Sequence, residues 1–65
     1  METTIYKIRV TWDDNGSLGL PDSVGTYHKR NARHMYFDTM REAERFASRY
    51  LQGRTKWSSR TVEMS

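Results

Sequence analysis

Three arginines, Arg41, Arg45 and Arg49, recur at intervals of four residues. On a helix this spacing places all three on one side, where their guanidinium groups can bind phosphates or the carboxylates of a protein partner. A solvated helix face is the ordinary alternative for such a row. We expect the row to face away from the core, and we treat it as a candidate contact surface.

A second group of cations lies between His28 and His34, with Tyr36 close behind it. Cations interleaved with aromatic rings serve nucleic-acid binding, in which charge holds phosphates and rings stack on bases. They serve protein interfaces as well, and a solvated loop remains an equal alternative. The candidate contact residues of this segment are Lys29, Arg30, Arg33 and Tyr36.

The third group lies near the C-terminus and contains Trp57 and Arg60. Trp57 has the opposite strand parity to Val62, so we expect its side chain to lie outside the core. An exposed tryptophan among cations is typical of a contact residue. The candidate macromolecule-binding residues are therefore Arg41, Arg45, Arg49, Lys29, Arg30, Arg33, Tyr36, Trp57 and Arg60.

Metal and catalytic signatures are weak in this sequence. If the run Asp13–Gly16 belonged to a calcium loop, Thr11 would be the first residue of that loop and Asp22 the last. Such loops need a carboxylate at the first position and a glutamate at the last, so neither end fits. His28 and His34 are six residues apart in a chain without cysteine, which disfavours zinc. No nucleophile elbow or glycine-rich phosphate loop is present either. We therefore expect a protein that is not an enzyme, with no metal and no cofactor.

The composition sets the scale of these groups. Sixty-five residues predict a single domain, 1–65, with a small core, and 11 basic against 8 acidic residues give a net charge of +3. This excess is too small to choose nucleic acid over protein as the ligand. We expect stabilisation by a partner or a homodimer to be as probable as an independent monomer. The N-terminal residues show no signal peptide or membrane span, so a cytoplasmic location is expected.

The elements that would position these groups form an α+β pattern. Residues 5–12 alternate as a strand, with Tyr6, Ile8, Val10 and Trp12 on one face and Lys7, Arg9 and Thr11 on the other. Residues 39–52 form the predicted helix, with Thr39 and Glu42 as a capping box and Gly53 as its stop.

The remaining strands are less distinct. Residues 24–29 and 33–37 predict either two short strands around a hairpin tip at Lys29–Ala32 or one bent strand. Residues 60–64 predict a closing strand, and the parity of Trp57 predicts a bulge or a break before it. The expected fold is a small antiparallel sheet of three to four strands with one helix packed across one face, in the order β-(β)-β-α-β.

The passage from strand to helix, Phe37-Asp38-Thr39 followed by Glu42-Ala43, resembles the three-stranded DNA-binding domain of phage integrase arms and plant ethylene-response factors. That resemblance implies a helix behind a sheet whose outer face enters the major groove. Here Lys7, Arg9 and the basic hairpin residues would line that face. The family ends with its helix, whereas this chain is predicted to add a strand.

The Thr39–Ala43 phrase is also similar to small phage-encoded host-takeover proteins that inhibit bacterial RNA polymerase or CRISPR complexes. This second resemblance implies a non-enzymatic phage or mobile-element protein that inhibits or modulates a host complex by direct protein contact. Because the chain is basic, such a protein would engage an acidic protein surface or a bound nucleic acid. We take protein contact as the leading hypothesis and duplex DNA binding by the sheet face as the alternative.

Overall fold

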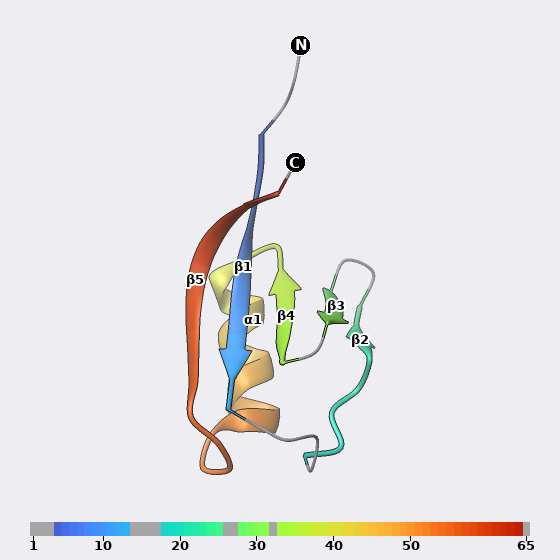
Figure 1. The fold of residues 1–65 in the computed structure, drawn as a ribbon, viewed down its shortest axis with the longest axis vertical. Helices are drawn as coiled ribbons and strands as arrows, with labels where there is room; N and C mark the ends of the chain where they lie inside the picture. Colours follow the sequence, from blue (N-terminus) through green and yellow to red (C-terminus); the bar gives the residue numbers. More distant parts are fainter. Residues whose placement is uncertain (1–3, 14–17, 26–27, 32, 65) are drawn as a thin grey trace.

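A five-stranded antiparallel sheet carries one helical segment on one of its faces (Figure 1). The computed structural model describes residues 4–13, 18–25, 28–31 and 33–64. The strands run in the spatial order β2-β3-β4-β1-β5. Their bounds are β1 Ile5–Trp12, β2 Ser23–Val24, β3 His28–Asn31, β4 His34–Phe37 and β5 Trp57–Met64. The predicted α+β class, with one helix across one face of an antiparallel sheet, is confirmed.

β1 lies at the centre of the sheet and pairs with β4 on one side and β5 on the other. Its side chains alternate as the sequence predicts, since Val10 and Trp12 are buried against the helix. The alternate residues Lys7, Arg9 and Thr11 therefore belong to the opposite face of the sheet.

The helix begins at Met40 and has two parts, α1 Met40–Phe46 and a π-helical turn η1 Ala47–Leu51. Thr39 caps it, because the Thr39 hydroxyl accepts a hydrogen bond from the Glu42 backbone N–H at 3.3 Å. Four apolar residues that recur at helical spacing are buried, namely Ala43, Phe46, Ala47 and Leu51. Gly53 follows with φ of +79°, a left-handed conformation typical of a residue just past a helix end.

Thr39→Ala is expected to lower the free energy of unfolding by about 1 kcal/mol, because it removes the side-chain acceptor of the Glu42 backbone N–H. In a domain of this size that corresponds to a fall in Tm of about 4–8 °C. Thermal melting followed by circular dichroism measures it, with Thr39→Ser as the control that keeps the hydroxyl. Equal melting of Thr39→Ala and the wild type would show that the cap contributes nothing.

Phe46 contacts three other aromatic rings in the core. Its ring centroid lies 5.9 Å from that of Trp12, 5.2 Å from Phe37 and 5.0 Å from Tyr50. Leu20 joins this core from the loop before β2, where its side chain is only 7% exposed. No pattern in the sequence predicted this anchoring role of Leu20.

Two sequence predictions about the strands are wrong. The supposed hairpin tip is strand in its described part, since Lys29 pairs with Tyr36 and Asn31 with His34; Ala32 lies outside the described residues. β2 and β3 are separate strands, and Gly25 follows β2 with φ of +76°. A run of charged residues resembles a turn locally, but pairing with β4 decides its conformation.

The predicted bulge before residue 60 is also wrong. β5 runs without interruption, and Trp57 pairs with Trp12 while Val62 pairs with Lys7. Trp57 thus lies on the helix side and packs, half-buried, against the core. Val62 lies on the other face of the sheet, away from the helix. The side of β5 on which Val62 lies is therefore not the side that faces the core.

β1 and β5 continue past the end of β4 as a two-stranded arm (Figure 1). We define the arm as Ile5–Lys7 paired with Val62–Met64. The last pair that β1 forms with β4 is Ile8 with Phe37, so only β5 accompanies the arm segment of β1. The arm contributes to the long dimension of the molecule, 42 Å against 19 and 18 Å.

Candidate nucleic-acid interface on the open sheet face

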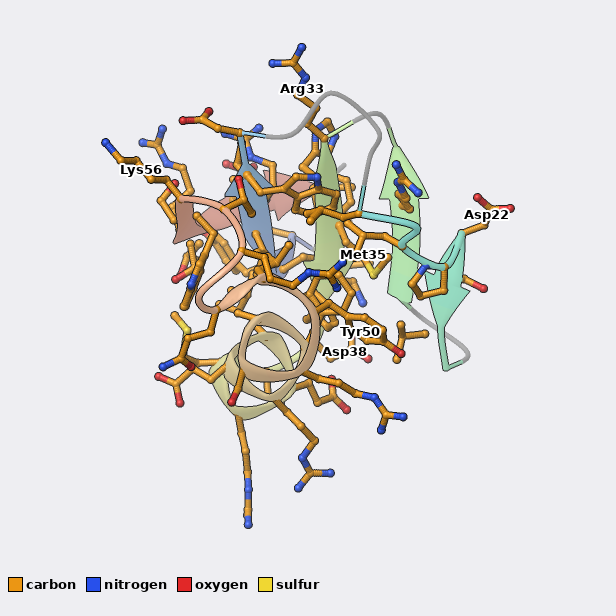
Figure 2. All side chains as sticks on the ribbon, turned by 90° about the horizontal axis from the view of Figure 1, so that it is seen from below. Asp22, Arg33, Met35, Asp38, Tyr50 and Lys56 are labelled. Atoms are coloured by element: carbon orange, nitrogen blue, oxygen red, sulfur yellow. The ribbon has the colours of Figure 1, made fainter. Side chains whose placement is uncertain are left out.

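The helix covers one side of the sheet, and the other side is left without a covering element among the described residues. Figure 2 shows Met35 between the sheet and the helix, and Arg33 projecting on the opposite side. We call this second side the open face. Its residues, by strand register, include Lys7, Arg9, Thr11, His34, Tyr36, Ser58, Arg60 and Val62.

Strand register brings an aromatic ring and two arginines into one line across the open face. Arg9 pairs with Tyr36 on β4 and with Arg60 on β5. Because directly opposed residues in antiparallel strands share a face, the three side chains are neighbours. Lys29 occupies the next register position, opposite Tyr36. We call Tyr36, Arg9 and Arg60, with the Lys29 position, the basic row.

Arg9 at the centre of the basic row has an unusual environment. The residue is half-buried, its Nε has almost no accessible surface, and this Nε makes no hydrogen bond to the described residues. A buried donor without an acceptor costs about 1–3 kcal/mol.

The charge around the basic row is positive. Asp38, an acid on this side, is engaged in a salt bridge with Lys7. Asp13 lies beyond the end of β1, and Glu63 pairs with Tyr6 and so belongs to the helix side. Arg60, in contrast, is exposed on the row itself. This arrangement can attract an anionic ligand to the middle of the sheet.

Tyr36 gives the basic row its aromatic surface. The ring is half-buried and meets His34 edge-on, with centroids 5.3 Å apart and planes at 82°. An edge-to-face contact occupies at most one face of the Tyr36 ring. Tyr36 can therefore serve as a platform for a base beside the arginines.

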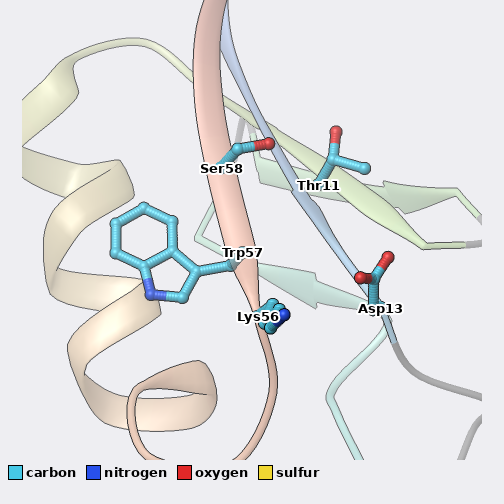
Figure 3. A pocket seen from close by; sticks show the side chains of 5 residues that line it. All are labelled: Thr11, Asp13, Lys56, Trp57 and Ser58. Carbon is cyan, nitrogen blue, oxygen red and sulfur yellow. The ribbon is translucent and has the colours of Figure 1, made fainter.

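A polar hollow of about 240 Å³ lies at the lower end of β1 and β5 (Figure 3). Thr11 and Ser58 are opposed in register there, so their hydroxyls share the open face. The volume is below the roughly 300 Å³ of ordinary small-molecule sites. The hollow therefore fits one group of a larger ligand that lies along the surface. Its lining residues are Thr11, Asp13, Lys56, Trp57 and Ser58.

The arginine ridge, Arg41, Arg45 and Arg49, is exposed on the helix as expected. It lies on the helix layer, which covers the side of the sheet opposite the open face, so the two basic surfaces are separate. Arg49 contacts the Tyr50 ring, with its guanidinium carbon 5.6 Å from the ring centroid. A second, more apolar hollow of about 180 Å³ borders the ridge and is lined by Val24, Phe37, Glu42, Arg45 and Phe46.

The predicted contact residues therefore divide by location. Tyr36 and Arg60 lie on the open face on either side of Arg9, and Arg33 is exposed at the rim of that face. Arg30 does not join them, because its Nη1 donates a hydrogen bond of 2.9 Å to the Leu20 carbonyl and its register partner is the buried Met35. Arg30 thus ties the loop before β2 to the sheet.

Arg9 was predicted to contact a ligand only under the DNA-binding alternative, and it is absent from the main list of candidate contact residues. The alternation of β1 placed it on the outer face, but its central position depends on its pairing with both β4 and β5. Sequence periodicity gives the face of a residue, and the neighbours across strands come from register. The unpaired Arg9 Nε is likewise visible only in three dimensions.

Among the described side chains, no set of three His, Cys, Asp or Glu residues could bind a metal ion. In the same part of the chain, no helix has the length and apolar character needed to cross a membrane. The chemistry that the described residues offer is anion binding with aromatic stacking.

Comparison with protein-family models, with curated proteins and with solved structures gave no match to this chain.

Proposed function

We propose that this protein is a non-enzymatic nucleic-acid-binding protein that uses the open face of its sheet. The observation that carries the proposal is the in-register line of Tyr36, Arg9 and Arg60 across β4, β1 and β5. Arginine forms paired hydrogen bonds to phosphate oxygens, and a tyrosine ring stacks on bases.

The width of the row favours a single strand over a duplex. Neighbouring strands are about 4.8 Å apart, so the row from Lys29 to Arg60 spans about 14 Å. The major groove of duplex DNA is only about 12 Å wide and accepts a helix or a two-stranded ribbon. The added strand β5 therefore favours binding of an unpaired strand laid across the sheet, in contrast to the groove insertion that the integrase-arm resemblance implies.

The proposal is tested by fluorescence anisotropy with labelled single-stranded and duplex oligonucleotides. Three phosphate contacts predict a slope of log affinity against log salt of about −2 for a single strand. Raising salt from about 50 to about 200 mM should thus weaken binding roughly twenty-fold. We expect tighter binding to the single strand than to the duplex. Absence of binding at low salt, or binding that salt does not affect, would overturn the proposal.

The hollow beside Arg45 supports a second candidate, contact with a protein. An apolar depression bordered by an arginine is typical of an interface anchor site, and Val24, Phe37 and Phe46 line this one. The protein would then be a phage or mobile-element product that inhibits or modulates a host complex, such as a CRISPR effector or RNA polymerase. Either candidate acts in the cytoplasm. They differ in the surface used, since Arg45→Glu disrupts only the second.

A further inference from the structure

The arm exposes large apolar side chains on both faces. Ile5 is 52% exposed on the open face, and Tyr6 is 61% exposed on the helix face. A two-stranded ribbon is marginally stable in water when nothing packs on it. Among the described strands none pairs with the outer edge of β5, so alternate residues along this strand direct their backbone N–H and C=O groups to an unpaired edge, the arm included. Such an edge is a template for another strand.

We propose that a second copy of this chain pairs with the outer edge of β5, strand against strand in antiparallel orientation. The charge of the arm selects this occupant. Lys7 is neutralised by Asp38, and Glu63 is the other charged residue of the arm. The arm is therefore neither strongly basic nor acidic, so no net charge of the arm opposes the approach of a second copy. A nucleic acid would find no cation there that is not already paired.

Like charges restrict how the two β5 strands can align. In a continuous sheet the two-fold axis is perpendicular to the sheet. It lies midway between the two β5 strands, where one residue of β5 is opposite the same residue of the copy. An axis at Arg60 would oppose two arginines, and an axis at Glu63 would oppose two glutamates, which is unfavourable. Of the positions that avoid both oppositions, Thr61 and Val62 lie at or next to the arm, so we place the axis at one of these two residues. The paired segment then includes Arg60–Met64 and covers the edge of the arm.

This dimer has a consequence for the proposed function, although it does not rest on it. Because the axis is perpendicular to the sheet, both helices lie on one side and both open faces on the other. The two basic rows then belong to one continuous ten-stranded sheet, twice the five strands of one copy. Two linked sites on one ligand bind more tightly than either alone.

Sedimentation equilibrium without nucleic acid tests the dimer independently of the proposed function. Over about 5 to 500 µM protein, the mass of the wild type should rise from 7.7 kDa toward twice that value. Val62→Lys places like charges at the junction and should remain at 7.7 kDa. Ser23→Lys adds the same charge at the other sheet edge, on β2, and should dimerise like the wild type.

The absence of cysteine allows a second readout. Thr61→Cys or Val62→Cys should form a disulfide-linked dimer on mild oxidation, because the residue on the axis faces its own copy. Ser23→Cys, on the opposite edge, should remain monomeric. A monomeric wild type at the highest concentration, dimerisation of Val62→Lys, or equal cross-linking of Ser23→Cys would overturn the proposal. Circular dichroism verifies that each variant is folded.

Discussion

Phe46→Ala is expected to leave a large fraction of the protein unfolded at about 25 °C, since truncation of a buried phenylalanine costs about 3–5 kcal/mol. The Phe46 ring is 3% exposed and contacts the rings of Trp12, Phe37 and Tyr50. A domain of this size has a total stability of about 3–10 kcal/mol. The loss is therefore about a third of the total stability or more.

Urea denaturation followed by circular dichroism measures the loss for Phe46. The control is Phe46→Leu, which retains most of the apolar volume and should recover part of the stability. Arg49→Ala, on the exposed side of the same helical segment, should change the midpoint little. A Phe46→Ala midpoint close to that of the wild type would show that the aromatic core is not the main source of stability.

The second large effect is expected at the centre of the basic row. Arg9→Glu removes a phosphate contact and places a carboxylate between Tyr36 and Arg60, so single-strand affinity should fall by about ten- to a hundred-fold. Arg9→Lys retains the charge but loses the paired geometry of the guanidinium, so an intermediate loss is expected.

Arg45→Glu is the matched control for Arg9. Both changes lower the net charge from +3 to +1, because each replaces one positive with one negative charge. Only Arg9 lies on the open face, so nucleic-acid affinity should fall far more for Arg9→Glu, as anisotropy at fixed salt will show. Equal losses would mean that net charge, and not the row, controls binding. Loss of a captured host protein with Arg45→Glu alone would instead support the second candidate.

Much of the fold follows from local patterns in the sequence. The helix is predictable because Ala43, Phe46, Ala47 and Leu51 recur at helical spacing and Thr39 provides a cap. β1 is predictable because apolar and polar residues alternate strictly from Tyr6 to Trp12. Both signals are short-range, so neither needs knowledge of what packs against the element.

The missed features are those that depend on distant partners. β3 forms because β4 pairs with it, and Trp57 joins the core because Trp12 lies opposite across the β1–β5 pair. Leu20 is an isolated apolar residue in a glycine- and proline-containing loop, where no periodicity reports its burial. Tyr36 and Arg60 were predicted as contact residues from their residue types, but their alignment with Arg9 in one row required the register of three strands.

The position of β5 in the sheet also bears on how the protein is made. β5 is the last strand along the sequence, yet it pairs along its whole length with β1, the first, from Ile5 with Met64 to Trp12 with Trp57. Contacts between residues so far apart in sequence slow folding. A nascent chain on the ribosome therefore has its central strand exposed on one side until residues 57–64 have emerged. Its sheet is completed only once residues 57–64 pair with Ile5–Trp12.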